Sequence, residues 1–228
     1  MRQIAVIGLG NFGFTVAKEL TDRGAQVIAI DEKKERIELI KECVTTAVAA
    51  DTTDEKALKA IGVHNVDVAV VCIGEDVEAN LLTTILLKKI GVKKIWARAI
   101  SPLQQEIIKT LEVDNIINLE EEMGRITANC LIAPNISKFI SLMPGHSFME
   151  LKVPRQFIGK SIEEIHPRKK HKVNIVAIKK KKPQITATGE RTFEEYLEDV
   201  PSSDIPLEED DVLLIVGKDE DLQKFSKQ

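Results

Sequence analysis

The sequence has few of the residues that mark several common classes of protein. Its 228 residues include only three cysteines, Cys43, Cys72 and Cys130, which lie far apart in apolar sequence. No Cys-x-x-Cys pair or zinc-ligand spacing occurs, so the pattern predicts buried, reduced thiols rather than a disulfide framework or a zinc site. Only 4% of residues are aromatic and the net charge is −4. Neither a basic field nor stacking aromatics therefore indicates nucleic-acid binding.

Long apolar runs are also missing. The uncharged stretch at residues 126–137 is short and contains Pro134, whereas a membrane span needs roughly 20 apolar residues. Met1 leads directly into an apolar strand rather than a secretory signal. These absences favour a cytoplasmic protein that does not cross a bilayer by itself.

The N-terminal segment carries the most informative motif. An apolar strand at residues 4–7 is followed by Gly8-Leu9-Gly10-Asn11-Phe12-Gly13 and then by an amphipathic helix. In such a G-x-G-x-x-G turn Gly8 makes the tight turn, Gly10 lets the backbone approach a pyrophosphate, and Gly13 lets helix and strand pack closely. The N–H groups at the start of the helix suit an anion. We interpret residues 4–31 as a nucleotide-binding β-α-β unit, with a degenerate fold that binds nothing as the alternative.

An acid ends the second strand of this unit. Asp31 follows the apolar run at residues 26–30, where a carboxylate accepts the hydroxyls of an adenosine ribose. A 2′-phosphate would meet this negative charge, so Asp31 favours NAD(H) or an adenine nucleotide over NADP(H). Glu32 is the next residue along the same loop and belongs to the same candidate site.

Strand and helix patterns then alternate as far as residue 119, which predicts an α/β fold with a Rossmann-like, doubly wound parallel sheet. The later strands are expected over residues 46–49, 67–73, 94–98 and 115–118. The expected helices cover residues 15–23, 32–42, a segment ending near 61, 77–90 and 101–111.

Residues that follow the strands complete the candidate site, because ligands of such sheets lie at the carboxyl ends of the strands. Asp51 and Thr52 either border an adenine or, through Asp51 or Thr53, cap the next helix. Ile73 and Gly74 end the most apolar strand, where Gly74 permits close approach to a ribose or serves as a plain turn. Arg98 ends the fifth strand and either reaches a phosphate or forms a surface ion pair.

The remaining sequence predicts a second, smaller α+β domain. A helix interrupted near Pro134 is expected over residues 120–141, with spare apolar surface that suits dimer formation. Met143-Pro144-Gly145 breaks the chain, so we expect domains at residues 1–142 and 143–228. Strands are expected over 147–153, 173–178, 183–188 and 211–217, helices over 161–166 and 219–225, a lysine-rich turn at 179–182, and an acidic excursion over 189–204.

Two charged clusters have open interpretations. The lysines and arginine at residues 168–172 and 179–182 form either a solvated face, an anionic-ligand site or a contact with acidic lipids. Glu120 heads a run of acids that favours a helix N-terminus or helps hold a divalent cation. No proton donor or nucleophile is placed to face a bound cofactor, so the sequence favours a non-enzyme. A small NAD-dependent oxidoreductase and an adaptor for another partner stay as alternatives.

Taken in order, these motifs resemble those of the RCK (regulator of potassium conductance) family. The resemblance rests on the glycine turn, Asp31, residues 50–53, 74–76, 97–99 and 120–124 for the N-terminal domain, and on residues 173–178 and 211–217 for the C-terminal domain. The whole chain is similar to the cytoplasmic Trk/Ktr-type subunits of potassium uptake systems.

The resemblance implies more than the residues alone. Members bind ATP, ADP, AMP or NAD(H), in some cases with Mg or Ca, and form dimers and eight-membered rings beneath a membrane potassium-transporting subunit. By position, Gly8, Gly10, Asn11, Phe12 and Gly13 would surround the phosphates, Asp31 and Glu32 the ribose, and Asp51, Thr52, Ile73 and Gly74 the nucleoside. Arg98 would approach phosphates and Glu120 a cation. Arg168 and Asn174 fall where some relatives contact a cyclic dinucleotide.

Two departures from the family pattern stand out. Asn11 replaces an arginine that meets the distal phosphate of ATP in many members, which weakens the case for discrimination between ATP and ADP. Glu112-Val113-Asp114 replaces the family's Gly-Ala-Asp before the sixth strand.

Overall fold

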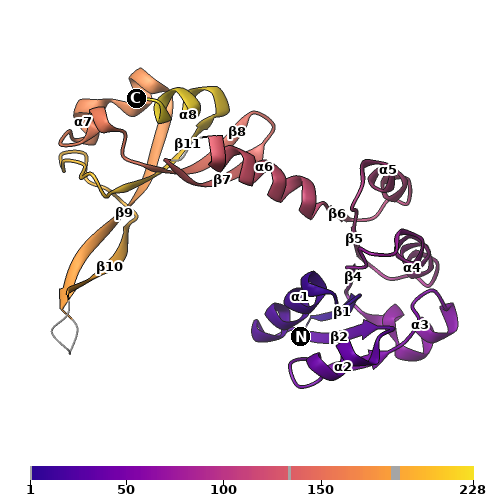
Figure 1. Ribbon diagram of the computed structural model, residues 1–228. Coiled ribbons are helices and arrows are strands. Elements are labelled where there is room, and N and C mark those ends of the chain that lie inside the picture. The colour runs from indigo at the N-terminus through magenta and orange to yellow at the C-terminus, as the bar shows by residue number, and fades with distance from the viewer. Residues whose placement is uncertain (1, 133–134, 186–190) are drawn as a thin grey trace. The chain divides into compact units, whose positions relative to one another are not determined.

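The computed structural model describes residues 2–132, 135–185 and 191–228 (Figure 1). Its contacts divide the chain into two compact units, Met1–Glu121 and Glu122–Gln228. Within the described ranges, every helix is too short or too polar to span a lipid bilayer.

The first unit is built on a six-stranded parallel sheet in the order β3-β2-β1-β4-β5-β6. The strands are β1 (Gln3–Ile7), β2 (Gln26–Asp31), β3 (Thr46–Ala49), β4 (Val68–Val71), β5 (Ile95–Arg98) and β6 (Asn115–Ile117). The chain reverses direction across the sheet between β1 and β4, which is the topological switch point of a doubly wound fold. The predicted Rossmann-like fold is confirmed.

Helices connect these strands and cover both faces of the sheet. They are α1 (Asn11–Asp22), α2 (Lys34–Ile40), α3 (Glu55–Ile61), the short η1 (Val63–Asn65), α4 (Val77–Lys89) and α5 (Pro102–Thr110). Alternate residues of the central strands pack into different hydrophobic cores, one on each face of the sheet. Ile7 and Val71 belong to one core, and Val6 and Val70 belong to the other. Burial on two faces explains why these strands appear in the sequence as continuous apolar runs.

Two helix starts differ from the sequence prediction. α1 begins at Asn11 instead of Thr15, so the last glycine of the motif lies inside the helix. α3 is capped by neither Asp51 nor Thr53, because the Asp54 carboxylate accepts the Lys56 N–H at 2.8 Å. The Asp51 carboxylate instead accepts the backbone N–H and the hydroxyl of Thr53, at 2.8 and 2.6 Å.

The second unit contains an antiparallel sheet in the order β10-β9-β11-β8-β7. Its strands are β7 (Ile136–Met143), β8 (His146–Lys152), β9 (Val173–Ile185), β10 (Arg191–Glu198) and β11 (Val212–Lys218). The helical segments are α6 (Leu119–Ile132), η2 (Arg155–Phe157), α7 (Ile162–Ile165), η3 (Pro167–His171) and α8 (Asp219–Ser226). Apolar side chains of β8 and β11 pack with Phe225 of α8 in the core.

The helix predicted over residues 120–141 is wrong beyond Ile132. Residues Ile136–Met143 form β7, which pairs with β8, and Gly145 (φ +79°) provides the turn between them. The Pro-Gly sequence that suggested a domain boundary therefore belongs to a β-hairpin. The expected division at 142/143 differs from the observed division at 121/122 because β7 packs into the second unit's core through Phe139. The predicted interruption at Pro134 lies outside the described residues.

The prediction of a lysine-rich turn at residues 179–182 is also wrong, because these residues lie inside β9. Acidic residues of β10 oppose them: Glu195 faces Lys181, and Glu194 faces Lys182. Opposite charges across a strand pair favour this pairing. Lys180 is buried beside Asp211 (3.6 Å) and Glu198 (3.8 Å), so it does not belong to a solvated face.

The expected return strand over 183–188 and excursion over 189–204 are corrected in the same way. Residues 183–185 continue β9, and the returning strand is β10 at Arg191–Glu198. The predicted strand residues 186–188 lie outside the described residues. The apolar residues Phe193, Tyr196 and Leu197 do not alternate with polar ones, so residues 191–198 carry no period-two strand pattern in the sequence.

Candidate functional site

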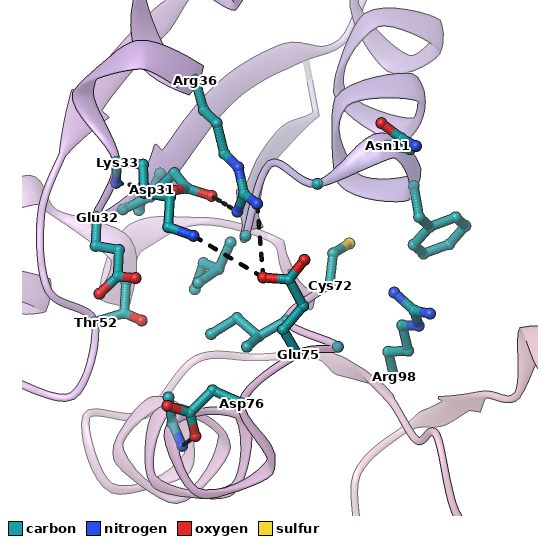
Figure 2. Close-up of a pocket in the computed structure, with 18 of the residues that line it drawn as sticks. Asn11, Asp31, Glu32, Lys33, Arg36, Thr52, Cys72, Glu75, Asp76 and Arg98 are labelled. Carbon is teal, nitrogen blue, oxygen red and sulfur yellow. Dashed lines mark hydrogen bonds and ion pairs between the residues drawn. The ribbon is translucent and has the colours of Figure 1, made fainter.

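A cavity of about 660 Å³ opens at the carboxyl ends of β1, β2 and β4 (Figure 2). This volume lies within the usual range for small-molecule sites. The cavity lies at the switch point of the sheet, as a ligand site of this fold class should. Its lining residues are Ile7, Gly8, Gly10, Asn11, Phe12, Ile30, Asp31, Glu32, Lys33, Arg36, Asp51, Thr52, Cys72, Ile73, Gly74, Glu75, Asp76, Ala79, Arg98, Ile100 and Glu120.

The structure brings the sequence-predicted residues of the first unit together around this one cavity. The predicted residues that line it are Gly8, Gly10, Asn11, Phe12, Asp31, Glu32, Asp51, Thr52, Ile73, Gly74, Arg98 and Glu120. Gly13 does not line the cavity and lies behind the turn. A Cβ on Gly13 would lie 1.9 Å from the carbonyl oxygen of Gly8, so this glycine permits the close contact between α1 and the turn.

The other two glycines shape the face that a ligand would meet. Gly8 has φ +88° and donates its N–H to the Ile30 carbonyl at 2.8 Å, which joins the turn to β2. No described atom lies within 4 Å of the point where a Gly10 side chain would begin. Gly10 is also the N-cap of α1 and provides no side-chain cap. The first N–H groups of α1 are therefore open to an anion in the cavity.

Asp31 is buried and serves as a hydrogen-bond centre (Figure 2). One carboxylate oxygen accepts the N–H of Leu9 at 2.6 Å and the Arg36 guanidinium at 3.2 Å. The other accepts the N–H of Lys33 at 2.8 Å. The carboxylate thus joins the glycine turn to the loop after β2.

Sequence reasoning missed the two cations beside Asp31. Lys33 and Arg36 point into the cavity from the start of α2, and each lies 3.9 Å from the Glu75 carboxylate of the opposite loop. Their signal was their spacing: residues 33 and 36 lie one helical turn apart, so both face the side from which Asp31 projects. The sequence pattern predicts a helix over residues 32–42 but assigns neither cation a part in the site.

Arg98 lies at the opposite end of the cavity. Its guanidinium pairs with the Glu120 carboxylate and lies 6.0 Å from the centre of the Phe12 ring. A Cβ on Gly74 would lie 2.5 Å from an Arg98 nitrogen. The arginine thus lies against the Gly74 backbone, whereas the sequence had suggested that this glycine allows approach to a ribose or serves as a turn.

Glu120 has an arginine partner in this structure. Desolvation is the largest single influence and raises the pKa of the Glu120 carboxyl group, but the hydrogen bond from Arg98, a backbone hydrogen bond and the charge of Arg98 together bring the pKa below its usual value. Among the described residues there is no group of three or more His, Cys, Asp or Glu side chains that could hold a metal ion.

The thiol of Cys72 lines the same cavity but is not a reactive nucleophile. Burial raises its pKa to about 12, so it stays protonated at neutral pH. The expectation of buried cysteines holds for Cys72, whereas Cys43 and Cys130 are only partly buried. All three are free thiols.

The remaining wall is fixed by a buried pair of hydroxyl groups. Thr52, in the loop after β3, shares a 2.8 Å hydrogen bond with Thr83 of α4. The neighbouring Asp51 has its pKa lowered by hydrogen bonds from the side chain and then the backbone of Thr53. This end of the cavity thus carries an ionised carboxylate.

The second unit has a separate cavity of about 520 Å³. Arg168 and Asn174 both line it, and the arginine donates to the asparagine oxygen at 2.7 Å. Sequence reasoning missed the residues that complete its wall after β10: Asp199, Val200, Pro201 and Ser203.

Comparison with known proteins places the chain in a family. Residues 4–119 match the TrkA-N domain. The chain is 32% identical to Ktr system potassium uptake protein A of Bacillus subtilis over 227 residues, which cover 100% of this chain and 96% of the relative.

Two solved structures have the same fold. The NAD(P)-binding domain of an exopolyphosphatase-related protein from Archaeoglobus fulgidus is 26% identical, with a TM-score of 0.51 over 58% of this chain and 98% of that domain. The GsuK channel is 16% identical, with a TM-score of 0.67 over 97% of this chain and 38% of the channel chain. By the family match and the whole-length identity, the chain belongs to the TrkA-N domain family and, within it, to the Ktr-type potassium uptake proteins.

Proposed function

We propose that this chain is a regulatory subunit of a potassium uptake system and that nucleotide binding in the first unit is its signal. One observation carries the proposal. Gly10 leaves open space above the cavity at the start of α1, with Asp31 at one end and Arg98 at the other. Open N–H groups suit a phosphate, the arginine adds a positive charge, and the carboxylate suits ribose hydroxyls.

The ligand class is an adenine nucleotide (ATP, ADP or AMP) or NAD(H). The Archaeoglobus domain of the same fold is an NAD(P)-binding domain. Asp31 opposes a 2′-phosphate, although Arg36 beside it offsets part of the charge. Asn11 is uncharged, so it offers no positive charge to the distal phosphate by which ATP differs from ADP. A Mg or Ca ion that accompanies the nucleotide would need the Glu120 carboxylate as a ligand. This carboxylate would become available if Arg98 left it to pair with the phosphates.

A regulatory role fits the chemistry of the cavity better than catalysis does. Among the described lining residues none is His, Tyr or Ser, and the one thiol is kept protonated. The wall therefore lacks histidine, the side chain that most often serves as a general acid or base. The alternative is a small NAD-dependent oxidoreductase, and cofactor turnover with candidate substrates would favour it.

The partners follow from family membership and from α6. Met123, Leu131 and Ile132 of this helix are exposed, and none of its described side chains is buried. Such a face suits a homodimer, and dimers would join into an octameric ring. A ring of this kind would lie at the cytoplasmic side of the membrane, bound to a potassium-transporting subunit. A nucleotide can bias that subunit only if it binds the ring's conformations with different affinity.

The cavity of the second unit is proposed as a second ligand site. Arg168 and Asn174 offer a guanidinium and an amide, which suit the phosphate and base of a cyclic dinucleotide. Asp199 in the same wall disfavours a densely charged anion.

The direct test is to titrate the full chain with ATP, ADP, AMP, NADH and NADPH by calorimetry while scattering reports its shape and mass. We expect binding of adenine nucleotides or NADH, weaker binding of NADPH, and a change of shape. Absence of binding to any of the five would refute the proposal. Co-purification with a membrane potassium-transporting subunit separates this role from that of an adaptor for another partner.

A further inference from the structure

Asn80, a residue of α4 that does not line the cavity, connects the ends of two strands beneath it. Its side chain is fully buried. The amide nitrogen donates to the carbonyl oxygen of Ile73 at 2.7 Å and to that of Arg98 at 3.1 Å. Asn80 therefore binds the chain just after β4 and the last residue of β5 at the same time.

These two bonds lie where the sheet stops holding the strands together. The last paired residues of β4 and β5 are Val71 and Ala97. Beyond this pair, the amide of Asn80 takes the place of a ladder hydrogen bond. Gln104 of α5, also buried, adds a weak contact to the Arg98 carbonyl at 3.4 Å and accepts the Ile100 N–H at 2.9 Å.

The residues held in this way are those that form the arginine end of the cavity. The Arg98 guanidinium lies against the backbone of Gly74, with no room for a Cβ between them. Its Nε atom is buried and has no hydrogen-bond partner among the described residues. A small shift of the β5 end relative to the β4 end would therefore move the guanidinium out of this contact.

We infer that Asn80 is a positioning residue for the phosphate end of the site: it fixes the backbones of Ile73 and Arg98 so that the arginine faces the cavity beside Gly74. This inference rests on the proposed nucleotide-binding function. It assigns Asn80 no contact with the ligand.

The test compares wild-type full-length protein with Asn80→Ala and with Thr84→Val. Thr84 is an equally buried residue of α4, and within the described part of the chain its hydroxyl donates to the Asn80 backbone carbonyl alone, at 2.7 Å. The first measurement is the Nε–H resonance of Arg98 in a nitrogen–proton correlation spectrum without nucleotide. We expect Asn80→Ala to shift or broaden it and Thr84→Val to leave it in place.

The second measurement is affinity for ADP and for adenosine, which lacks phosphates. Asn80→Ala should weaken the affinity for ADP about tenfold, which corresponds to the loss of one or two hydrogen bonds, because the displaced arginine no longer meets the phosphates. The affinity for adenosine should fall by less than about twofold. In an Arg98→Met background the same substitution should cost no further ADP affinity.

Equal weakening of ADP and adenosine, an undiminished loss in the Arg98→Met background, or an unmoved Arg98 resonance would overturn the inference. If Asn80→Ala does not fold, Asn80→Ser, whose shorter side chain cannot reach both carbonyls, decides by the same measurements. Wild-type protein that binds neither compound would refute the proposed function, and the Arg98 resonance would still decide the role of Asn80.

Discussion

The carboxylate of Asp31 accepts the backbone N–H of Leu9 at 2.6 Å, so the acid at the end of β2 holds the glycine turn that follows β1. A buried, charged acceptor shortens and strengthens such a bond. The residue proposed to bind a ribose therefore also fixes the loop proposed to bind phosphates, and the two ends of the site are joined by one side chain.

Asp31→Ala is expected to weaken adenine nucleotides by roughly 1.5–3 kcal/mol, the value of a charged hydrogen bond. Because the Leu9 N–H loses its partner in a buried site, the free energy of unfolding should also fall by about 1–3 kcal/mol. Calorimetric titration gives the first quantity and denaturant unfolding without ligand gives the second.

Asp22→Ala is the matched control, because Asp22 is exposed at the end of α1 and carries the same charge. It should change neither quantity. An Asp31→Ala protein with wild-type nucleotide affinity would place the ribose elsewhere.

Substitutions of Gly10 and Gly13 are expected to have different effects, the first on nucleotide affinity and the second on stability. No described atom would meet a Cβ on Gly10, so Gly10→Ala should keep the stability within about 0.5 kcal/mol while the methyl group blocks a phosphate, with an affinity loss of about tenfold or more. A Cβ on Gly13 would lie 1.9 Å from the Gly8 carbonyl, so Gly13→Ala should destabilise the unit by about 1–3 kcal/mol.

Thermal unfolding and nucleotide titration of the two variants provide the measurement. The Gly10→Ala protein tests the cavity and the Gly13→Ala protein tests the packing. Unchanged affinity in a folded Gly10→Ala protein would contradict phosphate binding at this turn.

Glu55 gives the first unit a pH-dependent stability. Hydrogen bonds from Lys59 (2.8 Å) and Lys89 (2.5 Å) lower the pKa of its carboxyl group to about 2 and join α3 to α4. A carboxyl group with a lowered pKa stabilises the folded state above its unfolded value of 4.5 and loses this contribution as the pH falls toward 2. Glu55→Gln should therefore be less stable than wild type at pH 7, with a difference that shrinks between pH 4.5 and 2.

Urea unfolding at pH 7, 4, 3 and 2 measures this difference. Glu106→Gln is the control, since Glu106 pairs with Lys109 inside the single helix α5. It should have the smaller effect at neutral pH, because pairs within one exposed helix contribute little. A Glu55→Gln difference that stays constant from pH 7 to 2 would contradict the lowered pKa.

The parallel sheet and the residues that line the cavity at its edge were accessible from the sequence because their signals are local. Each buried strand is a continuous apolar run, and the residues after β1, β2, β3, β4 and β5 must meet at one edge whatever the packing details. The environment of each residue was not accessible. Nothing in the sequence shows that the space beside Gly74 belongs to Arg98 or that Asp31 is already bonded to Leu9 and Arg36.

The second unit was harder to predict for a physical reason. Lysine and glutamate have low strand propensity, so neither Lys179–Lys182 nor the acidic segment of β10 predicts a strand by itself. The strand conformation becomes favourable when the two segments pair and their opposite charges face each other. Likewise, β7 follows a helix with similar apolar content, and its strand character comes from pairing with β8. A preference that arises only when two neighbouring segments pair leaves no signal in either segment alone.

Glu112 is strained, and the resemblance to the RCK family indicates how to relieve it. The residue has φ +50°, a left-handed conformation that costs a non-glycine residue about 1–2 kcal/mol, at the position where the family has glycine. Its side chain gives little in return, because the ion pair with Lys88 is exposed and 3.7 Å long. Glu112→Gly should therefore raise the free energy of unfolding by about 0.5–1 kcal/mol, after the entropy cost of glycine.

The control for this substitution is Glu112→Ala, which removes the same ion pair but keeps the Cβ and hence the strain. The bonds from the Lys88 ammonium group to the carbonyls of Leu111 and Glu112 are backbone contacts and survive in both variants. In thermal unfolding, glycine should raise the midpoint by about 1–4 °C and alanine should leave it level or slightly lower. Because the two variants differ only in the Cβ, equal midpoints would show that the left-handed backbone at residue 112 carries no cost.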